Sequence, residues 1–361
     1  MQKNSDKKKI YLKVLAGLFV FGGLIIGVLA QVFAPSMSPS AGESINHLYL
    51  LFESVGRGLL VIVGGAIVIS IIKKKKSSGR LRRNAIIGFM VSSFLLLIVL
   101  PLSTGFLEYY NVLMPFPWST LPLQLLYDGA YFSTNFSDTF GGNGVTILLL
   151  AYAVFNIVVY AGIAIYGRRF FCSMVCCNFG AHAETLKEGL PMFGEKKNVD
   201  EKIMPRIIKP LGLLKWILFA VNMVLIILWA VVILFEVDGI NVEILRVVEL
   251  FKYLLFELLL VLFAFATISG RTYCYYCPAG TMISLGSRLC GQRIDTDKND
   301  CIECGLCNKV CDMEIDIMSK AVIKKPVNSL SCVGCGACVD ACPVKALDYN
   351  TYIIARRNRL S

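Results

Sequence analysis

The chain has 361 residues with a mean hydropathy of +0.66, and charged residues make up only 17% of it. This composition is too apolar for a soluble globular protein and indicates a protein of the lipid bilayer. The net charge of +11 does not indicate nucleic-acid binding, because the basic residues gather at the ends of apolar runs, where they act as topology signals.

The first part of the chain contains three apolar runs, each long enough to cross a hydrocarbon core of about 30 Å. They are Ile10–Phe33, His47–Ile72 and Ala85–Thr104, and they follow a polar, basic start at residues 1–9. The first run is longer than the apolar part of a cleaved signal peptide, so we expect it to remain as a transmembrane helix. Residues 10–104 are therefore predicted to form three transmembrane helices.

Residues 105–144 contain no Lys or Arg and are rich in aromatic side chains. We expect an extracytoplasmic loop that lies on the membrane as an aromatic belt, with a docking surface for a partner as the alternative. The aromatic residues in question are Tyr109, Tyr110, Phe116, Trp118, Tyr127, Tyr131 and Phe132.

Three more apolar runs follow, at Val145–Tyr166, Leu211–Phe235 and Leu250–Ser269. The sequence thus predicts an α-helical membrane protein with six transmembrane helices, three of them within residues 145–290. Six spans place both termini on one side, and the basic clusters fall on that side: Lys3, Lys7–Lys9, Lys73–Lys76, Arg80–Arg83, Arg168–Arg169 and Lys196–Lys197. By the positive-inside rule this side is the cytoplasm, and the protein crosses the cell membrane several times.

A short motif occurs twice, each time where a predicted span meets the cytoplasm. The first copy is Gly-Arg-Arg-Phe-Phe-Cys-Ser-Met-Val-Cys at 167–176, and the second is Gly-Arg-Thr-Tyr-Cys-Tyr-Tyr-Cys at 270–277. Its four thiols, Cys172, Cys176, Cys274 and Cys277, are candidates for a third metal site, either an iron–sulfur cluster or zinc. Reduced thiols packed at helix ends are the alternative. Cys177 is a candidate substitute ligand, and Cys290 is expected to be structural.

Eight cysteines in the last part of the chain form two nearly identical groups. Each group reads C-x-x-C-x-x-C-x-x-x-C, a spacing that suits [4Fe–4S] clusters in which the fourth cysteine of one group reaches the cluster of the other. One predicted cluster is held by Cys301, Cys304, Cys307 and Cys342, and the other by Cys332, Cys335, Cys338 and Cys311. Zinc knots and disulfides are the alternatives, but neither needs this doubled pattern. We expect residues 291–361 to form a cytoplasmic α+β domain of the bacterial 2[4Fe–4S] ferredoxin type.

The spans, the two Gly-Arg-aromatic-Cys motifs and the paired ferredoxin motifs together resemble the membrane-bound 4Fe–4S polyferredoxins. That family includes the quinol-oxidising subunit of periplasmic nitrate reductase systems and the membrane iron–sulfur regulators of nitrous oxide respiration, and the resemblance covers residues 145–361. The chain departs from the pattern in three places. Cys177 replaces a proline, Cys274 and Cys277 are one residue closer than usual, and Asp312 stands where proline is commoner, a change expected to affect only a turn.

Ionisable residues within the predicted spans are candidates for passing electrons or protons onward. Glu53 and Arg57 share a helix face at i,i+4 near His47, and the alternative is that they only pair with each other and orient the helix. With two histidines in the whole chain, His47 and His182, a haem held by two histidines within the membrane is not expected. Arg356, Arg357 and Arg359 are expected to be solvated or to contact anionic lipid.

These features predict a membrane-anchored electron-transfer protein. Electrons from a cytoplasmic donor or from quinol would pass through the two clusters, and through the third site, to or from a respiratory oxidoreductase partner. Because the predicted clusters all lie at or beyond the cytoplasmic face, a quinone, a flavin or a partner subunit is expected to carry electrons across the membrane, and quinone is a candidate cofactor. The chain has no Walker A, Rossmann or nucleophile-elbow motif, so we expect a subunit of an oxidoreductase complex and not a stand-alone enzyme. The alternative is a redox-sensing or assembly factor for a respiratory metalloenzyme.

Overall fold

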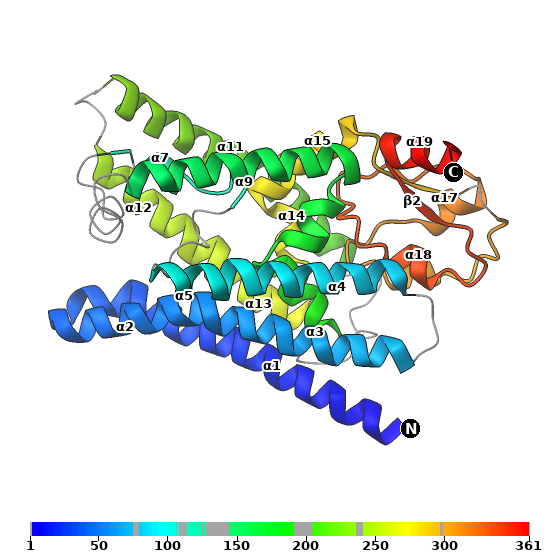
Figure 1. Ribbon diagram of the computed structural model, residues 1–361, viewed down its shortest axis with the longest axis horizontal. Coiled ribbons are helices and arrows are strands. Elements are labelled where there is room, and N and C mark those ends of the chain that lie inside the picture. Colours follow the sequence, from blue (N-terminus) through cyan, green and yellow to red (C-terminus); the bar gives the residue numbers. More distant parts are fainter. Residues whose placement is uncertain are drawn as a thin grey trace.

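The computed structural model describes residues 2–74, 79–105, 107, 114–124, 126–127, 144–190, 204–235, 241–296 and 299–360. Long helices form a bundle, and the cysteine-rich C-terminal region lies at one end of it (Figure 1). Both chain termini lie toward that same end (Figure 1). The fold therefore has one cysteine-rich end (Figure 1).

The N-terminal helices are long and interrupted by π- or 3₁₀-helical turns, which carry the label η. They are α1 (Gln2–Val28), η1 (Leu29–Phe33), η2 (Ala34–Ser36), α2 (Pro39–Leu51), η3 (Phe52–Gly56), α3 (Arg57–Lys74), α4 (Arg80–Ser93), η4 (Phe94–Val99) and α5 (Leu100–Thr104). Pro39 begins α2 at a position where its missing N–H costs no hydrogen bond. Gly105 ends α5 with a φ of 72°, a conformation that glycine adopts without strain.

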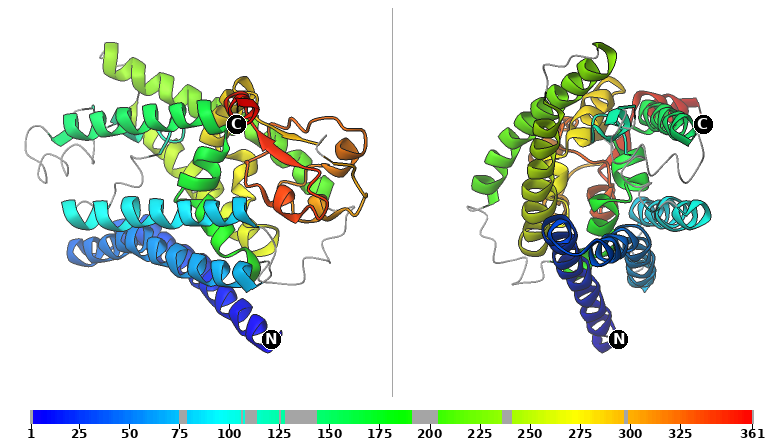
Figure 2. Two further views of the ribbon diagram at one scale, coloured as in Figure 1. Left: turned by 45° about the vertical axis from the view of Figure 1, so that its right-hand side comes forward. Right: turned by 90° about the vertical axis from the view of Figure 1, so that its left-hand side faces the viewer.

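The second half of the bundle alternates long helices with short ones. Its elements are α7 (Leu121–Gln124), α9 (Gly144–Tyr166), η6 (Phe171–Val175), α10 (Phe179–Thr185), η7 (Lys187–Gly189), α11 (Met204–Phe235), α12 (Val242–Lys252), η8 (Tyr253–Leu259), α13 (Leu260–Thr267), α14 (Tyr273–Tyr276) and α15 (Pro278–Leu289). Figure 2 shows the bundle from two further directions, including one that looks along the helices.

Five helices within the described residues are long and apolar enough to cross a membrane. They are Lys7–Ser36, Pro39–Ile72, Arg80–Thr104, Val145–Tyr166 and Pro210–Phe235, and each contains most or all of an expected span. The sixth expected span, Leu250–Ser269, is not one of the five. Its residues continue from α12 through the π-helical η8 into α13, and they include Lys252 and Glu257.

The chain between Gly167 and Leu190 re-enters the bundle after α9. Asn178, at the start of α10, accepts a hydrogen bond from Arg57. Arg57 lies near the middle of the Pro39–Ile72 helix, 18 residues after its start (57 − 39) and 15 before its end (72 − 57). At 1.5 Å per residue this is about 22 Å from Ile72. The start of α10, just after the first cysteine motif, therefore lies beside the middle of this helix.

A second segment, Met114–Gln124, enters the bundle between α9 and α11. The backbone N–H of Phe116 donates to Asn156 Oδ1 (2.8 Å), and the hydroxyl of Tyr160 donates to the Phe116 carbonyl (2.6 Å). Asn222 donates to the Pro117 carbonyl. Asn156 and Asn222 lie near the middle of their helices. The expected aromatic belt is thus wrong for Phe116 and Trp118, while Tyr109, Tyr110, Tyr131 and Phe132 lie outside the described residues.

The C-terminal region combines a small sheet with short helices. Its elements are β1 (Arg293–Asp295), α16 (Leu306–Lys309), α17 (Met318–Val322), α18 (Ala337–Ala341), β2 (Asp348–Asn350) and α19 (Tyr352–Leu360). The strands are antiparallel, with Ile294 opposite Tyr349. Asp340 accepts hydrogen bonds from the backbone N–H groups of Leu81 (3.4 Å) and Arg82 (2.8 Å), so this region caps the start of α4.

Candidate functional site

Two cavities in the C-terminal region are each lined by four cysteines. The first is lined by Cys301, Cys304, Cys307 and, from the other group, Cys342. The Sγ of Cys342 accepts a hydrogen bond from the backbone N–H of Ala346 (3.3 Å). The structure therefore brings the last cysteine of the second group to the first three of the first group.

The second cavity mirrors this arrangement. It is lined by Cys332, Cys335, Cys338 and Cys311, together with Arg271 from the second motif. The loop that carries these thiols turns at Gly334, whose φ is 69°, and a Cβ there would lie 2.8 Å from the Cβ of Arg169. Only glycine permits both the turn and the close approach.

The donor set in these cavities fits iron–sulfur clusters. Each cavity offers four thiols, and burial raises the pKa of Cys332, Cys335 and Cys338. These thiols must therefore lose protons when a metal group binds. Within the part of the chain that the structure describes, no group of three or more His, Cys, Asp or Glu side chains is arranged to hold a single metal ion. The arrangement suits a larger group whose iron corners lie between the sulfurs.

The four thiols of the two motifs also come together. Burial raises the pKa of Cys172, Cys176 and Cys277, and Cys274 lies close enough to all three for a charge on one thiol to act on the others. The backbone N–H of Gly280 donates to the Sγ of Cys277 (3.4 Å). We call Cys172, Cys176, Cys274 and Cys277 the repeat thiols.

Arg168 and Arg271, one from each motif, cross between the two copies. The Nη2 of Arg168 donates to the carbonyl of Cys274 (3.2 Å), and the Nη1 of Arg271 donates to the carbonyl of Cys172 (2.8 Å). Arg168 Nε also donates to the Sγ of Cys172 in its own motif (3.3 Å). Both side chains are almost fully buried, at 2% and 1% exposure. The two copies therefore form one unit in which a guanidinium of each fixes the backbone of the other.

A buried carboxylate holds one of these arginines. Glu184 Oε1 lies 3.0 Å from Arg271 Nη2, and its Oε2 lies 3.5 Å from Arg82 Nε. Burial alone would raise the pKa of Glu184, but Arg271, Lys187 and Arg82 together hold that pKa below its usual value. Glu184 is therefore ionised in the folded protein and anchors α10 to α4.

The C-terminal region is attached directly to the first motif. Arg169 Nη1 donates to the Gly334 carbonyl (3.0 Å), Ser173 Oγ to the Val333 carbonyl (2.7 Å) and Arg168 Nη1 to the Leu330 carbonyl (2.8 Å). Cys311 and Cys335 pack against the same apolar cluster as the repeat thiols. The cavity with Cys332 is thus the one next to the membrane helices, and the cavity with Cys301 is farther away.

Residues 293–343 match the family described as a 4Fe-4S dicluster domain. The C-terminal region is a 4Fe-4S ferredoxin domain. The matched residues include all eight cysteines of the two groups.

Three curated relatives extend this finding. YccM of Escherichia coli, a protein assigned by name to electron transport, is 26% identical over 202 residues, which cover 54% of this chain and 54% of YccM. An uncharacterized protein of Methanocaldococcus jannaschii is 32% identical over 101 residues (28% of this chain, 37% of the relative), and RdxA of Cereibacter sphaeroides is 40% identical over 52 residues (14% and 10%). The chain thus spans about half the length of YccM and less of the other two. No solved structure matches.

These similarities support an iron–sulfur electron-transfer family and agree with the apolar helices. These similarities do not test the resemblance to proteins of nitrate and nitrous oxide respiration, which stays a prediction.

The structure also shows where Cys177, Cys290 and Asp312 lie. Cys177 lies in a separate apolar cluster with Leu96 and Leu97, and its role as a substitute ligand stays a prediction. Cys290 ends α15, and its carbonyl accepts a hydrogen bond from Tyr352. Asp312 does more than form a turn, because its carboxylate lies 2.5 Å from Lys187 Nζ and joins the ferredoxin domain to η7.

The ionisable residues of the second span are Glu53, Arg57 and His47, and only the pairing of the first two agrees with the sequence-based expectation. Glu53 pairs with Arg57 at i,i+4, and Arg57 reaches beyond that pair to Asn178. His47 is exposed and does not take part in the pair. The side chains of Arg356 and Arg357 are exposed, and that of Arg359 lies outside the described residues.

Sequence reasoning missed the roles of Arg168, Arg271 and Trp118. Arg168 served only as a topology signal and Arg271 only as part of the second motif, although their identical place after glycine in both motifs was a usable hint. Trp118 donates from Nε1 to the hydroxyl of Tyr273 (2.9 Å), the residue before Cys274. No local signal in the sequence places a residue of the 105–144 segment beside a cysteine motif.

Proposed function

We propose that the chain is a membrane-anchored electron-transfer protein with two [4Fe–4S] clusters in its ferredoxin domain. Cys301, Cys304, Cys307 and Cys342 would hold the cluster far from the membrane, and Cys332, Cys335, Cys338 and Cys311 the cluster next to it. When bound, each cluster supplies a centre that gains or loses one electron. The pairing of three cysteines from one group with the fourth of the other, at both cavities, supports this assignment.

The observation that supports a path for electrons is the attachment of the second cavity to the repeat thiols. Arg168, Ser173 and Arg169 hold the Leu330–Gly334 loop, and Arg271 reaches both the second cavity and Cys172. The chain therefore provides a continuous protein path from the ferredoxin domain to thiols inside the helix bundle. A third iron–sulfur cluster on the repeat thiols would extend this path, with zinc as the alternative.

The membrane arrangement belongs to the same proposal. We infer six spans, with α12, η8 and α13 forming the sixth, both termini and the ferredoxin domain in the cytoplasm, and an α+β bacterial ferredoxin arrangement in residues 291–361. The electron donor would be cytoplasmic or a membrane quinol, and the partner a respiratory oxidoreductase. The basic clusters and the position of both termini at one end of the bundle support this orientation.

Anaerobic purification with iron and sulfide counts, followed by EPR spectroscopy during a redox titration, tests the proposal. Two clusters give about eight irons per chain and a third gives about twelve. Bound zinc in place of iron, or iron without a redox-active EPR signal, would contradict electron transfer through this chain.

A further inference from the structure

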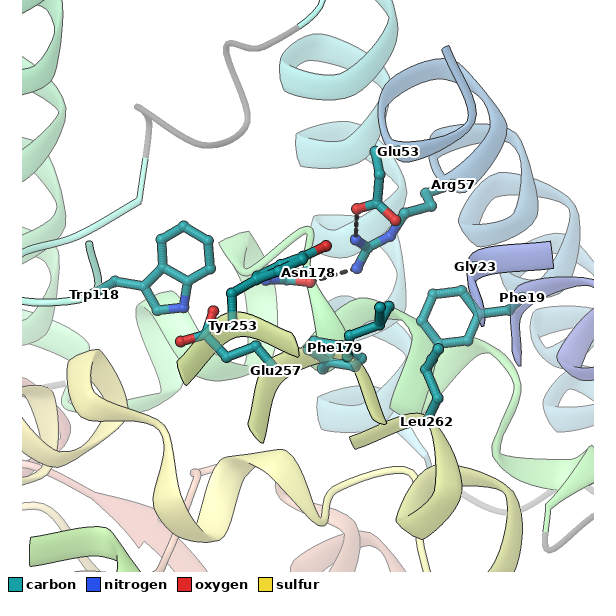
Figure 3. A pocket seen from close by; sticks show the side chains of 11 residues that line it. Phe19, Gly23, Glu53, Arg57, Trp118, Asn178, Phe179, Tyr253, Glu257 and Leu262 are labelled. Carbon is teal, nitrogen blue, oxygen red and sulfur yellow. Dashed lines mark hydrogen bonds and ion pairs between the residues drawn. The ribbon is translucent and has the colours of Figure 1, made fainter. Parts of the chain in front are cut away.

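Arg168 differs in its counter-charge from two other buried arginines of the bundle. Arg57 pairs with Glu53 (Figure 3), and Arg271 pairs with Glu184 at 3.0 Å. Arg168 is only 2% exposed, yet no carboxylate of the described residues forms an ion pair with it. Because an arginine stays protonated in proteins, a full positive charge is buried here without a carboxylate.

The guanidinium of Arg168 contacts two carbonyls and a thiol. Nη1 donates to the Leu330 carbonyl (2.8 Å) and Nη2 to the Cys274 carbonyl (3.2 Å). Nε donates to the Sγ of Cys172 (3.3 Å), and the thiol of Cys277 is close enough for its charge to act on Arg168. The carbonyls satisfy hydrogen bonds but carry no net charge. Since a buried charge without a counter-charge is costly, the balancing negative charge has to come from the sulfurs around Arg168.

The same side chain also reaches the ferredoxin domain. Leu330 precedes Cys332 by two residues. The backbone N–H of Arg168 donates to Gln292 Oε1 (2.6 Å), and Gln292 Nε2 donates to the carbonyl of Cys332 (3.0 Å). Burial raises the pKa of Cys332, and the positive charge of Arg168 opposes that rise. Arg168 therefore stabilises negative charge on both sides of the junction between the repeat thiols and the ferredoxin domain.

The two cysteine-lined cavities differ in the charges beside them. The cavity with Cys301 is lined by no Lys, Arg or His among the described residues, and Cys304 in its wall is exposed to solvent. The cavity with Cys332 is lined by Arg271, whose charge is balanced by Glu184. The buried charge that is left without a carboxylate near the second cavity is therefore that of Arg168.

From these contacts we propose that Arg168 is a positioning residue that raises the reduction potential of the cluster of Cys332, an inference that rests on the proposed electron-transfer function. Reduction brings one electron from a reduced donor and adds one negative charge, and no bond forms or breaks. Burial disfavours the added charge, because a surrounding of low dielectric stabilises it less than water does. The buried guanidinium offsets that cost, since the potential of an iron–sulfur cluster depends on nearby charge.

A redox titration of the full chain, purified anaerobically in detergent and followed by EPR spectroscopy, tests this role. The variant Cys332→Ala identifies the signal that belongs to the cluster of Cys332. In Arg168→Gln the midpoint potential of that cluster should fall by at least about 59 mV, a tenfold change in the equilibrium constant of a one-electron couple. The potential of the Cys301 cluster should stay at the wild-type value, because that cavity lies farther from Arg168.

Two further variants separate the charge of Arg168 from its contacts. Arg168→Lys keeps the charge and loses part of the hydrogen bonding, so it should lower the potential by less than half as much as Arg168→Gln. Arg357→Gln is the matched control: it removes an arginine charge from an exposed side chain of α19, where water and salt screen it, and both potentials should stay unchanged. If Arg168→Lys lowers the potential as far as Arg168→Gln, the charge of Arg168 does not set it and the inference is overturned.

Gln292→Glu gives the same test if Arg168→Gln does not assemble its clusters. It places a carboxylate beside Arg168 and cancels its charge, so the potential of the Cys332 cluster should again fall at least tenfold in the equilibrium constant. Unchanged potentials in Arg168→Gln or in Gln292→Glu, with wild-type clusters that titrate, would overturn the role of Arg168 and leave the proposed function standing. If the wild-type protein itself yields no redox-active cluster, the proposed function fails.

Discussion

At the scale of single residues, the sequence predicted which cysteines matter but not what surrounds them. The spacing of the eight ferredoxin cysteines is a local property, and the structure groups them around two cavities as that spacing suggests. The roles of Arg168 and Arg271 are not predictable from the sequence, because a charge pattern cannot distinguish a guanidinium at the lipid interface from one buried against carbonyls. Their partners, the carbonyls of Cys274 and Cys172, are about a hundred residues away in the chain.

The crossed assignment of the fourth cysteines can be tested by paired substitutions. If Cys311 belongs to the cluster of Cys332, the double variant Cys311→Ala with Cys332→Ala should lose one cluster, about four irons, and Cys311→Ala with Cys301→Ala should lose both. Iron counts and EPR signals of the anaerobic proteins give the answer, and Cys290→Ala serves as the control that keeps all clusters. The reverse pattern of losses would mean that each group holds its own cluster.

Replacing the buried carboxylate of Glu184 by an amide is predicted to destabilise the folded protein strongly. Glu184→Gln should destabilise the folded protein by about 3–5 kcal/mol, because it leaves Arg271 buried without its counter-charge. Glu188→Gln is the matched control: its partner Arg82 lies at 3.1 Å and its side chain is 26% exposed, so a loss of at most about 1 kcal/mol is expected. The free energies of unfolding of both variants and of the wild type, measured in detergent, test this difference.

The same carboxylate predicts a pH dependence. Because the pKa of Glu184 is lowered in the folded state, its stabilisation is complete above the unfolded pKa and is lost as the pH falls through the folded value. The stability difference between wild type and Glu184→Gln should therefore shrink only in acid, below the ordinary range for a glutamate. A difference that disappears already at neutral pH would contradict this account of the pair.

At the scale of elements, the long helices were predictable and the re-entrant segments were not. An apolar run of twenty residues or more is a strong signal, and five runs correspond to helices in the structure. The segments Gly167–Leu190 and Met114–Gln124 are short, and their backbone polar groups are satisfied by distant partners such as Asn156 and Asn222. Nothing within such a segment tells whether it lies on the membrane or inside it.

The unit formed by the two motifs predicts a third metal group. If the repeat thiols hold a cluster, the anaerobic wild-type protein carries about twelve irons, and Cys172→Ser with Cys274→Ser removes about four while the two ferredoxin signals remain. Cys290→Ser is the control for cysteine replacement as such. Unchanged iron in the double variant would return the repeat thiols to packed side chains, and loss of zinc in its place would make them a structural clip.

At the scale of the whole molecule, one end of the bundle carries the ferredoxin domain and both termini, together with Arg82, Arg168 and Arg169. The contacts of Asp340 with α4 and of Lys187 with Asp312 fix the ferredoxin domain to helices from both halves of the chain. The segment Met114–Gln124 lies away from that end, beside Asn156 and Asn222 near the middle of α9 and α11. The two ends of the bundle therefore differ, which gives the molecule a polarity along its helix axes.

This polarity makes the orientation in the membrane decisive. The positive-inside rule predicts that the ferredoxin end lies in the cytoplasm, where reducing conditions would keep its cysteines available for clusters. A reporter that is active only in the cytoplasm, fused after Ser361, should therefore be active, and one inserted near Asn135 should not. A reporter active only outside should give the opposite result at the same two sites. Activity of the outside reporter after Ser361 would reverse the path, because the clusters would then exchange electrons with partners on the outer side of the membrane.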